Sequence, residues 1–191
     1  MRYLPGHKAQ IHQKIVKDAS RRVRSEGLAG AAVSTVMRDA GMTHGGFYKH
    51  FESKDDLLIE ALSEAFAEIA DRLAQAAQQS KPGTEWKAIV KDYLTMEHCD
   101  HAEWECPLAA LGSELARTDK AVKARIFGEL VKYRSRMLPF MPGHKTADKE
   151  RAFFAIFSTM IGAIELARLL PEPAMRAKVL ESARDLLVTA F

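Results

Sequence analysis

The sequence predicts an all-α protein, and two observations carry this prediction. Apolar residues recur at helical spacing along most of the chain, as in Ile15, Ala19 and Val23. No stretch alternates apolar and polar residues for long enough to form a strand. The expected architecture is about nine helices. A three-helix N-terminal unit with a helix-turn-helix occupies residues 1–53, and a larger helical unit occupies residues 54–191.

Glycines, prolines and capping side chains set the expected helix ends in chain order. A first helix ends at Gly27, a second runs from Val33 to Ala40, and a third is compressed between Thr43 and Phe51. The segment Ser53–Asp56 is a capping box that opens a long fourth helix over residues 54–79. Further helices are expected from a cap at Thr84, from Pro107, from a cap at Asp119, over residues 147–170 and over residues 173–190.

Composition narrows the class of protein. Of the 191 residues, 47% are hydrophobic and 28% are charged, which is typical of a soluble globular protein. With two cysteines and no signal-peptide pattern at the N-terminus, the chain is expected in the reducing cytoplasm. The longest uncharged apolar run, residues 152–164, is shorter than the roughly 20 residues that span a bilayer. Membrane insertion is therefore not expected.

Charge divides unevenly along the chain. Residues 1–54 hold ten Lys or Arg and four Asp or Glu, for a net charge of +6, whereas residues 55–191 carry −3. A basic head on a mildly acidic body fits a polyanionic partner. A solvated basic surface explains the same numbers, so charge alone does not name the partner.

Residues 33–51 have the layout of a helix-turn-helix, in which the second helix enters the major groove of DNA. Gly41 supplies the positive φ that the tight turn needs, and Thr43 is expected to cap the second helix. Gly45 and Gly46 stand side by side in that helix, although each costs about 0.5–1 kcal/mol relative to alanine. Their presence indicates close approach to a nucleic-acid backbone or to the neighbouring helix.

The segment 41–58 resembles the N-terminal signature of the tetracycline-repressor (TetR/AcrR) family. It reads Gly41-Met42-Thr43-His44-Gly45-Gly46-Phe47-Tyr48-Lys49-His50-Phe51, followed by Lys54 and Leu57-Leu58. The resemblance covers about residues 8–60. It implies a homodimeric regulator, most often a repressor, that binds palindromic double-stranded operator DNA and is released by a small-molecule effector. No cofactor follows from it.

The resemblance also implies which residues contact DNA. By position these are Thr43, His44, Gly46, Tyr48, Lys49 and His50, with Lys54 gripping a phosphate. The second helix departs from the family pattern, because Ala31, Ala32 and Met37 replace the residues usual there. Ser34 and Arg38 are expected to take over the phosphate contacts on that side.

The body holds many bulky apolar residues, which at helical spacing are more often core than pocket lining. Candidates for a ligand pocket or sensor are Trp86, Tyr93, Met96, Cys99, Trp104, Cys106 and Phe127. Cys106 precedes Pro107 at a helix start, where the helix dipole stabilises a thiolate. It is therefore a candidate redox or electrophile sensor, and a pair of ordinary semi-buried cysteines is the alternative.

The last two helices combine small and apolar residues in a pattern that permits close helix packing. The residues concerned are Ala155, Ser158, Gly162, Met175, Val179, Ala183 and Leu186. A four-helix interface across a two-fold axis is the expected use, because closed two-fold dimers are the commonest oligomers. Packing within one chain is the alternative.

An enzyme is the rival hypothesis from another class. Potential metal ligands gather at His98, Asp100, His101 and Glu103, so a small helical metal-dependent enzyme is conceivable. Their spacing matches no standard zinc pattern, and no nucleophile–base pair or phosphate-binding loop accompanies them. Neither catalytic nor metal-ligating residues are expected.

Overall fold

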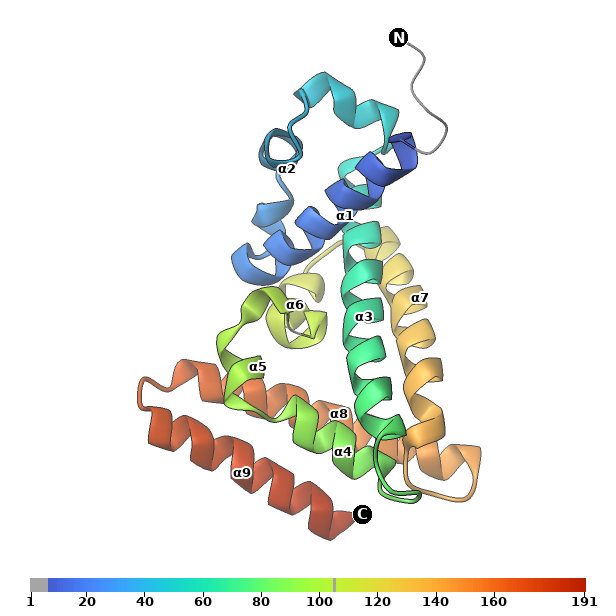
Figure 1. Ribbon diagram of the computed structural model, residues 1–191, viewed down its shortest axis with the longest axis vertical. Helices are drawn as coiled ribbons and strands as arrows, with labels where there is room; N and C mark the ends of the chain where they lie inside the picture. Colours follow the sequence, from blue (N-terminus) through green and yellow to red (C-terminus); the bar gives the residue numbers. More distant parts are fainter. Residues whose placement is uncertain (1–6, 105) are drawn as a thin grey trace.

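The protein is described by a computed structural model over residues 7–104 and 106–191, so Arg2 of the basic head lies outside the described residues. All regular secondary structure in those ranges is helical, which confirms the all-α prediction. A small helical head lies at one end of a larger helical body (Figure 1). The long helix α3 (Lys54–Gln78) leads from the head along the body.

Four helical elements form the head. They are α1 (His7–Glu26), the 3₁₀ helix η1 (Leu28–Ala31), α2 (Val33–Asp39) and the 3₁₀ helix η2 (His44–Lys49). Their core contains Ile15, Ala19, Val36, Met37, Phe47 and Phe51, together with Leu57 and Ala61 of α3. The head core therefore continues beyond residue 53 into α3.

The body consists of α3 and the elements that follow it. These are α4 (Glu85–Tyr93), α5 (Met96–Asp100), η3 (Ala102–Trp104), α6 (Pro107–Leu115), α7 (Lys120–Met137), η4 (Leu138–Phe140), α8 (Thr146–Leu169) and α9 (Pro173–Ala190). Helices α3 and α7 pack side by side, and α8 and α9 lie together at the end remote from the head (Figure 1). The short elements α5 and η3 fill what the sequence predicted to be a plain connection.

Two of the predicted caps form and two do not. Ser53 Oγ accepts the amide of Asp56 at 3.1 Å, and Asp119 Oδ1 accepts the amides of Ala121 and Val122 at 2.8 and 2.9 Å. The prediction that Thr43 caps the third helix is wrong. That helix is a 3₁₀ helix, and the Gly46 amide donates to the Thr43 carbonyl at 2.9 Å rather than to the hydroxyl. The Thr84 hydroxyl likewise makes no cap and donates to the Lys81 carbonyl at 2.7 Å.

Head and body share a second apolar cluster, so no flexible linker separates them. It joins Val23 and Ala31 of the head to Leu58 and Leu62 of α3, Leu111 and Leu115 of α6, and Val122 and Ile126 of α7. A polar contact reinforces it, because the Leu28 amide donates to Glu114 Oε2 at 2.9 Å. Gly27 has φ +75°, and a Cβ there would lie 2.7 Å from Glu114 Oε1, so only glycine fits.

Helix α8 corrects one part of the sequence reasoning. By length and composition alone it is apolar enough to cross a membrane, which the test on uncharged runs missed because a span tolerates one or two charges. Its inner face packs in the main core of the body through Phe153, Ile156, Phe157 and Met160. A core helix passes the same test of length and composition, so the apolar character of α8 is accounted for by this packing.

Candidate nucleic-acid interface

The turn between α2 and η2 is built around Gly41. This residue has φ +73°, a conformation that side chains other than glycine rarely adopt, as the sequence predicted. The chain then returns on itself, and the Met42 amide donates to the Met37 carbonyl at 2.8 Å. The turn sets η2 against α2.

The two adjacent glycines of η2 serve different purposes. Gly46 is buried, and a Cβ there would lie 3.2 Å from Met42 Cε and 3.5 Å from Met37 Cε. Gly46 therefore serves packing against Met42 and Met37, and its contact with DNA stays a prediction. Gly45 is exposed, and a Cβ there would have no described atom within 4 Å.

The segment 43–50, called the recognition segment below, exposes most of the predicted DNA contacts. Tyr48 is 71% exposed and rests its ring edge-on against Phe47, with centroids 5.3 Å apart. Thr43, His44 and Lys49 are also exposed, and so is Lys54 at the start of α3. On the packed α2, Ser34 and Arg38 are exposed, the Arg38 side chain to 75%.

His50 differs from these residues because its ring is half-buried. The ring lies 5.9 Å from that of His12, and its Nδ1 is buried without a hydrogen-bond partner among the described residues. Burial, followed by the charges of His12, Lys8 and Lys49, lowers the pKa of His50. The ring therefore packs inside the head and is a weaker candidate for a DNA contact than Tyr48 or Lys49.

Several head arginines are held by carboxylates. Arg22 donates to Asp39 and Glu26, both at 2.7 Å, and the buried Arg24 donates to Glu68 of α3 at 2.6 Å. Their charges are matched within the protein. Lys49, Lys54 and Arg38, by contrast, are exposed cations of the head and of the start of α3.

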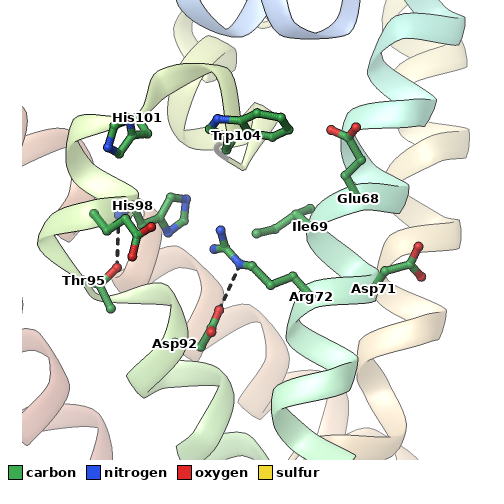
Figure 2. Close-up of a pocket in the computed structure, with 10 residues that line it drawn as sticks. Glu68, Ile69, Asp71, Arg72, Asp92, Thr95, His98, His101 and Trp104 are labelled. Carbon is green, nitrogen blue, oxygen red and sulfur yellow. Dashed lines mark hydrogen bonds and ion pairs between the residues drawn. The ribbon is translucent and has the colours of Figure 1, made fainter. Parts of the chain in front are cut away.

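A cavity of about 740 Å³ lies in the body between α3, α4, α5 and η3 (Figure 2). It is lined by Glu68, Ile69, Asp71, Arg72, Asp92, Thr95, Glu97, His98, His101 and Trp104. Of the predicted ligand-contacting residues, only Trp104 lies here. The polar residues of α3 that line the cavity were not predicted from the sequence, because polar residues on a helix are typical of a solvated surface. The spacing of Glu68, Asp71 and Arg72 on one face of α3 was the available signal.

The other predicted pocket residues lie elsewhere. Trp86, Tyr93, Cys99 and Cys106 are buried in the body core, with Met96 packed against it. Phe127 is 66% exposed and lines a second, largely apolar cavity of about 260 Å³ between α7 and α8. The expected apolar pocket around the cysteines is therefore filled by core side chains.

His98 forms the centre of a buried hydrogen-bond network. Its Nδ1 lies 2.7 Å from the Tyr93 carbonyl oxygen, and its Nε2 accepts the Cys106 amide at 3.2 Å. This pairing fixes the neutral ring with the proton on Nδ1. Burial, and after it the charges of Arg72 and Arg168, lower the pKa of His98 from 6.5 to about 3.

The potential metal ligands of the enzyme hypothesis are engaged in other contacts. Both ring nitrogens of His98 are engaged, Asp100 pairs with Arg176, and His101 Nδ1 lies 3.6 Å from Glu103 Oε1. Over residues 7–104 and 106–191, no three His, Cys, Asp or Glu side chains are grouped to hold a metal ion. The structure does not bring the four residues of the enzyme hypothesis to one point.

The outward faces of α8 and α9 are unusually apolar. Ala155, Ser158 and Gly162 are exposed on α8, as are Met175 and Leu186 on α9, whereas Val179 and Ala183 are partly buried against the core. The structure adds exposed residues that the sequence reasoning did not name, notably Leu166 and Leu169, the latter 80% exposed. A Cβ at Gly162 would meet no described atom within 4 Å.

The lowered pKa of His98 should make the free energy of unfolding depend on pH. Since its pKa is lower in the folded chain, the unfolded chain binds more protons between pH 6.5 and about 3. The free energy of unfolding should therefore fall as the pH falls through this window, by up to about 1.4 kcal/mol per pH unit from this group. Urea unfolding of wild type and His98→Gln between pH 7 and 4 measures the difference. Equal slopes for the two proteins would show that His98 titrates normally.

The burial of both cysteines should make alkylation of their thiols slow in the folded protein. Both thiols are buried, and a reactive sensor cysteine needs solvent access. Iodoacetamide at neutral pH should therefore alkylate Cys99 and Cys106 far more slowly in the folded protein than in urea, as followed by mass. Equal rates in the two states would reinstate Cys106 as a sensor.

Comparison with known proteins matches this architecture. Residues 15–61 match the family model "Bacterial regulatory proteins, tetR family". The chain is 33% identical over 67 residues to the HTH-type transcriptional regulators Rv1816 of Mycobacterium tuberculosis and Mb1846 of Mycobacterium bovis. That match covers 35% of this chain and 29% of each relative.

Two solved structures resemble the chain over nearly its whole length. A TetR transcriptional regulator from Chloroflexus aurantiacus superposes with a TM-score of 0.75 at 24% identity, covering 95% of this chain and 94% of the other. The transcriptional regulator FadR from Bacillus subtilis, solved in complex with stearoyl-CoA, superposes with a TM-score of 0.70 at 18% identity, covering 94% of this chain and 98% of the other. The N-terminal match therefore shows that residues 15–61 are similar to the tetR family of bacterial regulatory proteins, and the solved structures show that the chain shares their fold over nearly its whole length.

Proposed function

We propose that the chain is a one-component transcription regulator of the cytoplasm, most simply a repressor. It binds operator DNA as a homodimer through the recognition segment and is released by a small-molecule effector. The observation that carries this proposal is the exposure of Thr43, His44, Tyr48 and Lys49 on a basic head.

DNA binding is supported by the chemistry of that surface. Lys49, Lys54 and Arg38 offer cations to phosphates, and the Thr43 hydroxyl and His44 ring offer polar groups to phosphates or base edges. Tyr48 presents an exposed aromatic ring whose hydroxyl can make a polar contact with DNA. Gly45 leaves the backbone of η2 uncovered, so a DNA backbone can approach it closely.

Dimerisation is supported by the outward apolar face of α8 and α9. Leu166, Leu169, Met175 and Leu186 all stand exposed there. Large apolar side chains exposed on two neighbouring helices favour an interaction site, and a two-fold axis would bury them against a second copy of the chain. Gly162 at the middle of α8 permits close approach of a partner helix.

Effector binding is supported by the 740 Å³ cavity, whose size is that of a small-molecule site. A related fold, FadR of Bacillus subtilis, was solved with stearoyl-CoA. An effector releases DNA by binding the DNA-incompetent arrangement more tightly than the competent one.

Removing exposed side chains from the recognition segment, or Lys54 beside it, should weaken DNA binding. Lys49→Ala and Lys54→Ala should each weaken operator binding and lower the slope of log K against log salt by about one. Tyr48→Ala should weaken binding without changing helicity, because the ring is exposed. Fluorescence anisotropy with a selected DNA duplex measures all three. Lys91→Ala, an exposed lysine on α4, is the matched control and should bind like wild type.

The assignment of this surface would be contradicted by a triple variant of Tyr48, Lys49 and Lys54 that binds the duplex with wild-type affinity and salt slope.

A charge on the outward face of α8 should prevent dimerisation. Gly162→Glu places a charge on the apolar face at a position that is open in the folded chain. It should give folded monomers by light scattering and lose operator affinity. Gly128→Glu, at an equally open glycine on α7, is the control and should remain dimeric. An unchanged dimer in Gly162→Glu would place the interface on another surface.

A further inference from the structure

The roof of the large cavity is also the place where α1 of the head is attached. Two lining residues, Glu68 and Trp104, each hold an arginine of α1. Arg24 Nη2 lies 2.6 Å from Glu68 Oε2, and the Arg21 guanidinium carbon lies 4.6 Å from the centre of the Trp104 ring. Figure 2 shows Glu68 and Trp104 at the upper edge of the cavity.

Both contacts recognise the same chemical group. A carboxylate pairs with a guanidinium through charge-assisted hydrogen bonds, and an indole face attracts it through its quadrupole. The roof of the cavity thus binds two planar cationic groups, which are the guanidinium groups of Arg24 and Arg21. The Arg24 side chain is fully buried, so its charge depends on partners within the protein.

The rest of the lining carries more acidic than basic side chains. Four carboxylates line the cavity with one arginine, Arg72, whose Nε lies 3.0 Å from Asp92 Oδ2 and whose Nη2 is buried without a hydrogen-bond partner among the described residues. Of the other two carboxylates, Asp71 pairs with Arg136 outside the cavity, and Glu97 is exposed at its rim. His98 is neutral at physiological pH and adds no positive charge.

We propose that this cavity binds a flat organic cation, such as an aromatic amidine or guanidine, that pairs with Glu68 and stacks on Trp104. The ligand would compete with Arg24 and Arg21 for these two side chains. It would thereby weaken the attachment of α1 to the body.

A displaced α1 would reach the DNA-binding surface directly. Ile15 and Ala19 of α1 pack in the same core as Phe47 of the recognition segment. Ligand binding and the attached arrangement of α1 would then exclude each other, which is the differential affinity that an effector requires. This last step rests on the proposed function, whereas cation binding in the cavity does not.

Three probes of one shape test the ligand class: benzamidine, which is cationic, benzamide, which is neutral, and benzoate, which is anionic. Calorimetric titration of the full chain should show saturable binding of benzamidine and at least about tenfold weaker binding of the other two. Benzamidine should also change a tryptophan fluorescence signal that is absent in Trp104→Leu. Preferential binding of benzoate would assign the cavity to anions through Arg72, and binding of none of the probes would equally overturn the proposal.

Two variants of α3 locate the site. Glu68→Gln should weaken benzamidine binding by about tenfold or more. Glu64→Gln should leave it unchanged, because Glu64 stands one turn earlier, also contacts α1 through Lys17 at 3.8 Å, and does not line the cavity. Circular dichroism checks that both variants fold, and Trp104→Leu provides the second test if Glu68→Gln does not. Wild-type affinity in a folded Glu68→Gln, or in Trp104→Leu, would refute the site.

A DNA measurement on the same protein separates this inference from the proposed function. Wild type that binds a selected duplex but not benzamidine would overturn the cation site alone. Wild type that binds benzamidine but no DNA would overturn the proposed function and leave the cation site standing.

Discussion

The ion pair between the buried Arg24 and the partly exposed Glu68 joins the two halves of the molecule. Arg24 lies in α1, whose inner face forms the head core, and Glu68 lies in α3, whose far side packs on α7. A buried guanidinium deprived of its carboxylate is strongly unfavourable, because its charge is then uncompensated in a low-dielectric surrounding. Together with the Val23–Leu62 apolar cluster, this pair fixes where the recognition segment lies relative to the cavity.

A separate hydrogen-bond network around His98 ties together the elements on one side of the cavity. His98 is held between the Tyr93 carbonyl and the Cys106 amide, so α4, α5 and the start of α6 are tied by one ring. Arg168 of α8 donates to the Cys99 and Ala109 carbonyls at 3.2 and 3.0 Å and fastens the same segment from below. The wall of the cavity that faces the head, with Glu68 and Trp104, is outside this network, and we expect a ligand to act on that wall.

Much of this arrangement is local and was predictable from sequence. Gly41, Ser53 and Asp119 set turns and caps through their own chemistry, and helical spacing identified Ile15, Ala19 and Val23 on the buried face of α1. What escaped prediction depends on contacts distant in the chain. Gly45 and Gly46 are indistinguishable in sequence, yet only Gly46 meets Met42 and Met37. The lining of the cavity combines α3 with residues some 30 positions later, and its carboxylates read locally as a solvated face.

Selection of bound sequences from a random pool of duplex DNA, followed by sequencing, tests the central claim most directly. A homodimer that reads DNA with the recognition segment should enrich an inverted repeat whose half-sites lie about one helical turn, roughly 10 bp, or a multiple of it apart. Enrichment of no sequence, or of a single unrepeated site, would contradict the account.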